Sequence, residues 1–356
     1  MKQILLLFLY IALPVQLLSQ DHILATHKAD SISQAFFTKY SLPGLSISIY
    51  KDDGLIWSKG YGYADIENKI SVSPSETLFR VGSVSKTYTA AGMGVLIQNN
   101  KLDPRKTVQT YVPGFPEKKY PITVKEVAGH IAGIRHYRGN EFMNTKKYAT
   151  VTEGLQFFKD DSLLFEPGTD YKYSSYGWNL ISAVIEGASG EAFLPFMKSE
   201  VFEPLGMDHT LPDWSDQEIE NRSKFYIWRN GTNVEAPYVD NSYKWAGGGF
   251  IGTTEDMIRF GEAHLDYDFL DEETQKALMT PQKLNNGKST NYGMGWSVFN
   301  DSATGYWIGH TGGSVGGTTM FIINKEHRMV IAFTINRSGA EFDNLHFKLA
   351  QVFLTE

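Results

Sequence analysis

The chain has 356 residues, 42% of them hydrophobic and 21% charged, and its 33 Lys and Arg against 40 Asp and Glu give a formal net charge of −7. This composition is near the globular average and excludes a disordered, collagen-like or coiled-coil chain, while the acidic balance argues against nucleic acid or an anionic membrane as a partner. The absence of cysteine removes disulfides, thiolate nucleophiles and cysteine-based metal sites.

The N-terminus has the pattern of a signal peptide. Lys2 precedes an uncharged, mostly apolar run from Ile4 to Leu18, and small or polar residues follow. This run is shorter than the roughly 20 residues that a membrane span needs, so we expect a signal peptide at 1–19 and no stable membrane span after its removal. An uncleaved anchor is the alternative. Export of a chain without cysteine is typical of the periplasm or the exterior of a bacterium.

Hydrophobic periodicity predicts helices and strands in a definite order. Apolar residues alternate with polar ones at Leu45, Ile47 and Ile49, which indicates a strand. The expected elements are a helix at 23–40, strands at 45–50 and 55–58, a helix beginning near 83, mainly helical segments over 123–201, a capped helix at 253–265, strands at 306–309, 318–323 and 329–336, and a closing helix at 343–354.

Strands at both ends with helices between them predict an α+β fold. We expect one antiparallel sheet completed by both termini and flanked by helices, with an all-helical lobe inserted in the middle. The expected division assigns 20–95 and 236–356 to the sheet lobe and 96–235 to the helical lobe, within one domain.

Without cysteine, a nucleophile must be serine or threonine, and Ser-x-x-Lys is one activated pattern. It occurs as Ser48…Lys51 and as Ser83…Lys86. Residues three apart fall on opposite faces of a strand but on one face of a helix, so the pair in the predicted strand cannot cooperate. Ser83 precedes a helical run, where free N–H groups favour an alkoxide and an oxyanion. The alternative is a serine that caps the helix and a solvated lysine.

Two competing sites are weaker. Ser314 lies in a Gly-x-Ser-x-Gly pattern, but a turn and a strand follow it instead of the helix of a nucleophile elbow. His130 and His136 are six residues apart and lack the i, i+4 spacing of a zinc pair on a helix. No glycine-rich phosphate loop follows a strand. We therefore expect neither a metal nor a cofactor.

Three motifs follow one another along the chain: Ser83-Val84-Ser85-Lys86, Tyr173-Ser174-Ser175 and His310-Thr311-Gly312. They resemble the three motifs of class C β-lactamases and related penicillin-recognising serine hydrolases. Within that family, Arg135-His136-Tyr137 and Tyr111-Val112-Pro113 with Phe115-Pro116 are most similar to the mitochondrial serine β-lactamase-like group and its bacterial relatives. The resemblance implies that Ser83 is acylated, that Lys86 and Tyr173 share the proton transfers, and that the N–H groups of Ser83 and Gly313 form the oxyanion hole. It also implies substrate contacts from Ser175, His310, Thr311 and Gly312. Whether Lys86 or Tyr173 is the base stays open.

Two departures from the family pattern bear on the substrate. Ser175 replaces an asparagine, and His310 replaces a lysine that would hold a substrate carboxylate. If His310 stands where relatives carry lysine, the site should prefer uncharged esters or internal peptide bonds at pH 7.5 and should regain a cation when His310 is protonated near pH 6. We therefore expect an exported serine hydrolase for small ester, amide or peptide substrates. A true β-lactamase or D-Ala-D-Ala carboxypeptidase and a penicillin-binding sensor without turnover are the alternatives, and the oligomeric state is open.

Overall fold

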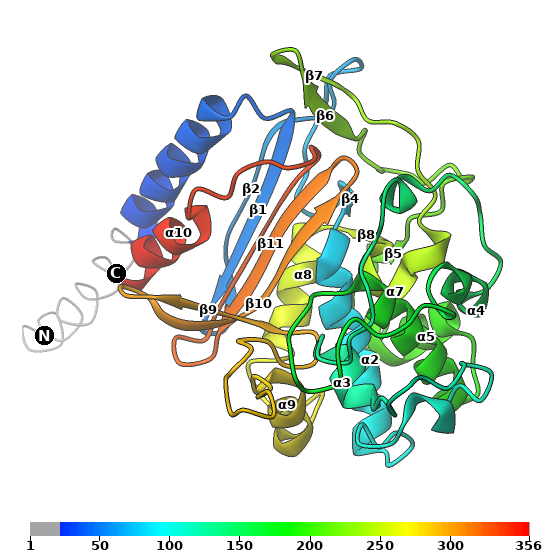
Figure 1. The fold of residues 1–356 in the computed structure, drawn as a ribbon. Coiled ribbons are helices and arrows are strands. Elements are labelled where there is room, and N and C mark those ends of the chain that lie inside the picture. Colours follow the sequence, from blue (N-terminus) through cyan, green and yellow to red (C-terminus); the bar gives the residue numbers. More distant parts are fainter. Residues whose placement is uncertain (1–21, 356) are drawn as a thin grey trace, which may run out of the picture.

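The computed structural model describes residues 22–355, so the expected signal peptide at 1–19 lies outside the described residues. A seven-stranded sheet crosses the molecule in the order β3-β2-β1-β12-β11-β10-β9, and all its neighbouring strands are antiparallel (Figure 1). The strands are β1 (Gly44–Lys51), β2 (Gly54–Asp65), β3 (Ile70–Ser71), β9 (Ser297–Asp301), β10 (Gly305–Ser314), β11 (Gly317–Asn324) and β12 (Met329–Ile335). This sheet, built from both ends of the chain, confirms the predicted α+β class.

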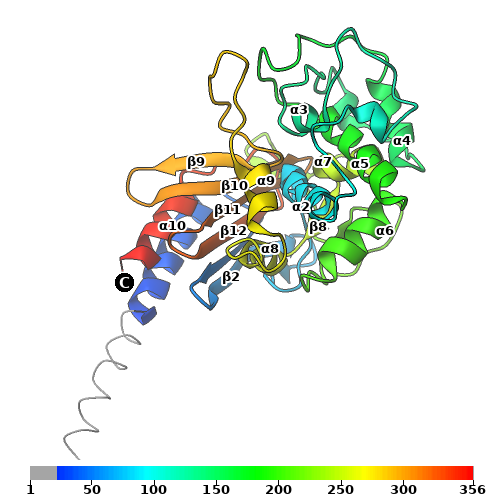
Figure 2. The same cartoon turned by 90° about the horizontal axis from the view of Figure 1, so that it is seen from below.

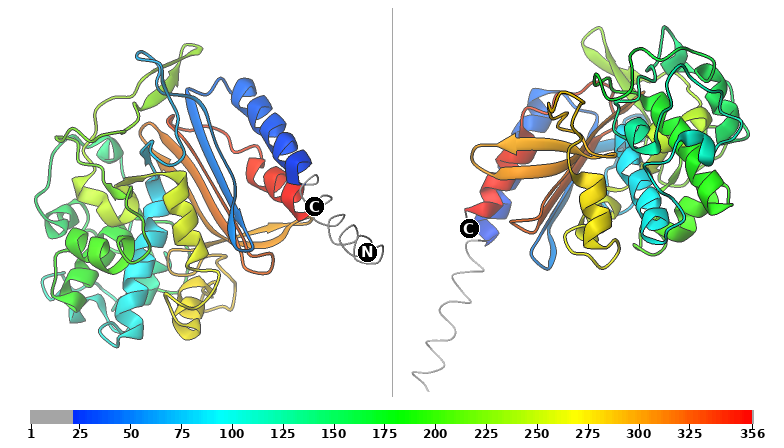
Figure 3. Two further views of the ribbon diagram at one scale, coloured as in Figure 1. Left: turned by 180° about the vertical axis from the view of Figure 1, so that it is seen from behind. Right: turned by 60° about the horizontal axis from the view of Figure 1, so that its bottom comes forward.

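Each face of the sheet is covered, because β1 presents apolar and hydroxylic side chains alternately. Leu45, Ile47 and Ile49 join an apolar cluster with the helix at 22–39 and α10 (Leu345–Leu354), which lie side by side on one face (Figures 1 and 3). On the other face, the Ser46 and Ser48 hydroxyls hydrogen-bond the Thr254 hydroxyl at 2.7 and 2.8 Å. Thr254 begins α8 (Thr254–Glu262), which therefore packs on the face opposite α10.

A helical region lies beside the α8 face of the sheet (Figure 2). Its central helix α2 (Ser85–Gln98) contacts β10 and the helices α5 (Ser175–Ser189) and α7 (Trp245–Gly248), and the first twelve residues of α2 are buried. The other α-helices here are α3 (Val124–Ala128), α4 (Val151–Gly154), α6 (Phe193–Met197) and α9 (Glu272–Met279). Short strands β4 (Phe79–Arg80), β8 (Phe250–Gly252) and β5 (Leu211–Pro212) form a second sheet, and β6 (Tyr226–Arg229) pairs with β7 (Thr232–Glu235). The boundaries expected for the two lobes stay a prediction.

Within residues 22–355, no single helix is long and apolar enough to cross a membrane. Only when taken together do the helical segments Ser175–Ser189 and Phe193–Phe202 reach the length and apolar composition of a membrane span, and the two segments meet at an angle of 82°.

Candidate active site

Ser83 lies in the 3-10 turn η1 (Gly82–Val84), directly before α2. Gly82 has a φ of +53°, and a Cβ at this position would lie 2.8 Å from the backbone nitrogen of Gly313. The close approach of these two backbones therefore requires glycine at 82. It places the first turn of α2 against the end of β10, so that Ser83 sits where the helix meets the sheet.

The Ser83 hydroxyl lies between two candidate proton carriers. Lys86 Nζ is 3.0 Å from Ser83 Oγ, one helical turn further along the chain. Tyr173 Oη is 2.8 Å from the same oxygen and donates a hydrogen bond to it. Both distances allow direct proton transfer. The structure thus brings together the three residues that the motifs single out.

Lys86 is fully buried, and three oxygen atoms lie within hydrogen-bond distance of its Nζ. Its Nζ donates to the carbonyl of Gly247 at 2.5 Å and lies 3.3 Å from Ser175 Oγ. Ser175, at the start of α5, therefore keeps a contact with Lys86 although the amide of the family's usual asparagine is absent. Burial, and to a lesser degree the charge of Lys244, holds the pKa of Lys86 well below its ordinary value of 10.5. A neutral amine has a lone pair that can accept the Ser83 proton.

Tyr173 keeps its proton, because burial raises the pKa of its phenol above the ordinary value of 10. Two histidines fix the Tyr173 loop. His130 Nδ1 accepts from the backbone N–H of Ser174, and His136 Nδ1 accepts from that of Ser175, both at 3.1 Å.

His130 and His136 have a structural role beside Tyr173. The ring of His130 packs against that of Tyr173 with centroids 4.3 Å apart. Among residues 22–355, no group of three or more His, Cys, Asp or Glu side chains could hold a metal ion. Sequence reasoning missed this role, because only the fold shows that the two rings face successive N–H groups.

The end of β10 presents backbone to the Ser83 site. β10 pairs with β9 only through Gly305–Gly309, so its outer edge is open beyond that point. In an antiparallel pair of strands, hydrogen-bonded and non-hydrogen-bonded residue pairs alternate. The two-residue turn after Ser314 makes Ser314 and Gly317 a hydrogen-bonded pair, so the next pair, Gly313 and Thr318, is not hydrogen-bonded. The N–H of Gly313 therefore points to the open edge, toward Ser83, as an oxyanion hole requires.

The two competing serines, Ser314 and Ser48, both lie in strands of the large sheet. Ser314 ends β10 and is followed by a turn and β11, which is not the strand–helix junction of a nucleophile elbow. Ser48 is inside β1, where its hydroxyl bonds Thr254, whereas Lys51 Nζ donates to the carbonyl of Phe353 at 2.7 Å. Ser48 and Lys51 therefore point to different sides of the sheet.

The expectation for His310 is wrong in one respect: the ring is buried and does not become a cation near pH 6. Its Nδ1 donates to the carbonyl of Thr311, and its Nε2 accepts from Tyr292 Oη at 3.0 Å. Burial and the neighbouring Lys86 lower the pKa of His310 to about 3. A ring with both nitrogens engaged in this way is neutral. Thr311 is half-buried on the strand beside it.

The cavity at Ser83 is small, about 70 Å³. It is lined by Ser83, His136, Tyr137, Phe142, Tyr173, Ser175, Lys244, Gly247, Gly248 and Gly313. Lys244 in this wall was not singled out from the sequence.

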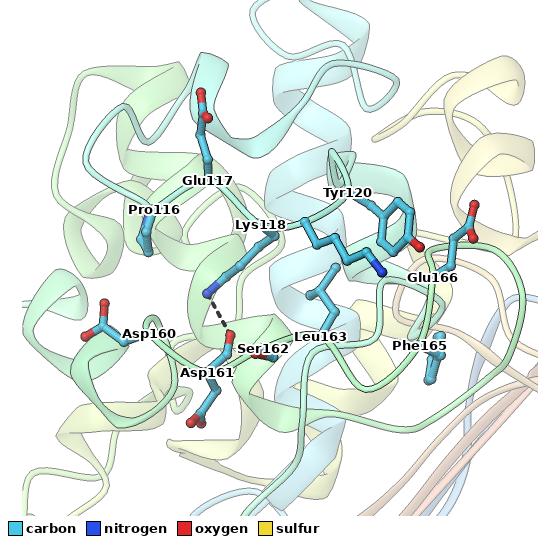
Figure 4. Close-up of a pocket in the computed structure, with 11 residues that line it drawn as sticks. Pro116, Glu117, Lys118, Tyr120, Asp160, Asp161, Ser162, Leu163, Phe165 and Glu166 are labelled. Carbon is cyan, nitrogen blue, oxygen red and sulfur yellow. Dashed lines mark hydrogen bonds between the residues drawn. The ribbon is translucent and has the colours of Figure 1, made fainter.

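A larger hollow of about 450 Å³ lies on the helical region, between the segments 116–120 and 160–166 (Figure 4). The side chain of Lys118 crosses it and donates to the carbonyl of Asp161 at 2.8 Å. This hollow contains none of the residues of the three motifs, so the chemistry is assigned to the smaller cavity.

The fold and the site geometry define a serine hydrolase of the β-lactamase type. The Beta-lactamase family model matches residues 29–353, and the chain belongs to this family. It is 30% identical over 379 residues to the mitochondrial serine beta-lactamase-like protein LACTB of Homo sapiens, covering 80% of this chain and 69% of that protein. It is 28% identical to penicillin-binding protein 4* of Bacillus subtilis (strain 168), covering 84% and 70%. These findings confirm the family resemblance.

Solved structures share the fold at lower identity. The octameric penicillin-binding protein homologue from Pyrococcus abyssi superposes with a TM-score of 0.79 at 23% identity, covering 92% of this chain and 77% of that one. The D-amino acid amidase from Ochrobactrum anthropi SV3 superposes with a TM-score of 0.79 at 20% identity, covering 93% and 97%.

Proposed function

We propose that this protein hydrolyses ester, amide or peptide substrates through an acyl-enzyme on Ser83. The observation that carries the proposal is the position of Ser83 Oγ, 3.0 Å from a buried lysine amine and 2.8 Å from a tyrosine hydroxyl. Burial disfavours the charge on Lys86, so the amine is available as a base. Lys86 is therefore assigned as the base in acylation.

The proton balance follows from these assignments. Ser83 Oγ attacks the substrate carbonyl while its proton passes to Lys86 Nζ, and the N–H groups of Ser83 and Gly313 stabilise the oxyanion. When the tetrahedral intermediate collapses, Tyr173 gives its proton to the leaving group and regains one from the Lys86 ammonium. A water molecule then attacks the acyl group, and its proton returns to Ser83 through the same pair. No net proton is gained or lost by the protein.

The range of substrates is proposed from the relatives. One of them carries the name penicillin-binding protein 4*, and a D-amino acid amidase shares the fold. Cleavage of a β-lactam or of a peptide near its C-terminus is therefore the second candidate activity. We also propose export, from the apolar segment at the N-terminus.

Intact-mass analysis after exposure to a fluorophosphonate, and separately to penicillin, tests the acyl-enzyme. We expect one adduct on the wild type and on Ser314→Ala, and none on Ser83→Ala. An adduct that survives in Ser83→Ala and disappears in Ser314→Ala would refute the proposal. A stable penicillin adduct, together with no turnover of esters or peptides, would show a sensor instead of a hydrolase.

A further inference from the structure

A second cavity, of about 890 Å³, reaches the first residue of α7. That residue is Trp245, whereas Gly247 and Gly248 of the same short helix line the catalytic cavity. Among residues 22–355, none lines both cavities. The second cavity is therefore a separate site, and its volume is within the range of pockets that bind small organic molecules.

The walls of this cavity come from separate parts of the helical region (Figure 2). One wall is α6 with the segment η5 (Lys198–Phe202) that follows it, and η5 has the wide turn of a π-helix. The start of α4, the end of α5 and the strand β5 form the others. Turns of π-helix are rare and frequently occur at functional sites.

Aromatic rings form much of the lining. The ring centroid of Phe250 is 5.1 Å from that of Phe202 and 6.3 Å from that of Phe193. Trp214 and Trp245 add a pair of rings with centroids 4.8 Å apart. Such a surface binds an apolar body, and the faces of aromatic rings also attract a cation.

Glu186, near the end of α5, gives this cavity a carboxylate without a cationic partner. Its side chain is half-buried, and its Oε1 accepts a hydrogen bond from the backbone N–H of Phe193 at 2.8 Å. Within the described residues 22–355, no positively charged group forms an ion pair with it. Burial raises the pKa of the Glu186 carboxyl above its ordinary value of 4.5. A cation beside this carboxylate would therefore be favoured.

The other charged residues of the lining do not offset Glu186. Lys198 Nζ lies 3.4 Å from Oε1 of Glu203, which also lines the cavity. Asp208 adds a further carboxylate at an exposed position. The charge of the lining is therefore negative, which disfavours an amphiphilic anion such as a fatty acid.

We propose that this cavity binds an apolar organic cation, an amine whose ammonium group pairs with Glu186 and whose apolar body lies against the aromatic rings. The hydrogen bond from Phe193 holds the carboxylate beside the segment that carries these rings, so one molecule can reach both. The inference goes beyond the proposed hydrolase function. It does not depend on acylation of Ser83.

Three probes with one apolar body and different end groups test the proposal on the wild type. They are 2-(naphthalen-1-yl)ethylamine, 2-(naphthalen-1-yl)ethanol and naphthalen-1-ylacetate, and titration calorimetry at pH 7.5 gives the dissociation constant of each. We expect the amine to bind about fivefold more tightly than the alcohol, as for a partly exposed ion pair, and the carboxylate to bind most weakly. No binding of the amine, or tighter binding of the alcohol or the carboxylate, would overturn the inference.

Glu186→Gln tests the place of the ammonium group. The glutamine amide can still accept from the N–H of Phe193, so the variant removes the charge and keeps the local hydrogen bond. We expect its affinity for the amine to fall by about fivefold or more and its affinity for the alcohol to stay as in the wild type. Equal affinity of the wild type and Glu186→Gln for the amine would overturn the inference.

Glu200→Gln is the matched control. Glu200 lies in η5, close along the chain to residues of the wall, but it does not line the cavity. Its replacement removes the same charge from the same region, and the affinity for the amine should stay at the wild-type value. A loss as large as that in Glu186→Gln would show a general effect of net charge and would refute the assignment of the site.

Discussion

Replacing Lys86 by methionine tests whether the site holds a neutral amine. The unfolded chain protonates lysine up to its ordinary pKa of 10.5, whereas burial disfavours the proton in the folded protein. If Lys86 is neutral in the folded protein, folding at pH 7.5 must remove its proton. This pH is about three units below the pKa of 10.5 in the unfolded chain, so the loss of the proton costs about 4 kcal/mol. Methionine has no such proton, although the carbonyl of Gly247 loses its donor at a cost of about 1–2 kcal/mol. We therefore expect the variant to be about 2–3 kcal/mol more stable, with kcat lowered by about 100-fold or more.

The pH dependence makes this prediction specific. Because the folded-state pKa of Lys86 is depressed, the unfolded chain binds more protons above that pKa, and the stability of the wild type rises with pH up to about 10.5. The advantage of Lys86→Met should therefore shrink by about 1.4 kcal/mol per pH unit. Urea denaturation of both proteins at pH 7, 8 and 9 measures it. Lys101→Met, at an exposed position beyond α2, reports the effect of removing one surface charge.

A stability difference between wild type and Lys86→Met that is independent of pH would show that Lys86 keeps its proton in the folded protein. In that case Lys86 could not be the base, and Tyr173 would have to take the Ser83 proton.

Three further predictions concern the neighbouring residues. Tyr173→Phe should lower kcat for an ester by about 100-fold while the circular dichroism spectrum stays unchanged, because only the proton donor is removed. Gly312→Ala should lower the melting temperature, because the new Cβ would lie 2.0 Å from the carbonyl oxygen of Val81. Gly313→Ala should melt like the wild type, because a Cβ at position 313 has no atom within 4 Å. His310→Gln and the wild type should show the same change in the penicillin-to-ester kcat/KM ratio when the pH falls from 7.5 to 6, because a pKa of about 3 keeps His310 neutral at both pH values. If only the wild type showed such a change, His310 would be the group that titrates.

The parts of the fold that could be predicted from the sequence are those with a clear period. Leu45, Ile47 and Ile49 alternate with serines because both faces of β1 are covered, one by helices and one by the Thr254 hydroxyl. The strand β9 was missed, because it lies at the sheet edge and its side chains are partly exposed on both faces. The predicted strand at 306–309 was also too short. Its continuation contains glycines, which are unfavourable in strands, but the backbone of β10 pairs with β11 as far as Ser314.

The site was predictable where local spacing decides it. Ser83 and Lys86 are one helical turn apart, so their contact follows from the motif, whereas Tyr173 could be placed only through the family resemblance. The role of His136 and the burial of Lys244 could not be predicted. Lys244 follows a polar segment that is typical of a surface, and its burial depends on rings contributed by distant parts of the chain.

The electrostatics of the cavity explain why Lys86 is a neutral base. No carboxylate pairs with Lys86 or Lys244 among residues 22–355, and the nearby Glu141 is held by Arg135 at 2.7 Å. Desolvation without a counter-ion depresses the pKa of each lysine, which makes one of them a base at neutral pH. The same absence leaves no negative charge to oppose the oxyanion that forms when Ser83 attacks. When Lys86 accepts the proton, its positive charge appears as the oxyanion develops. The burial of Lys86 without a carboxylate partner therefore makes it a stronger base and also helps to stabilise the transition state.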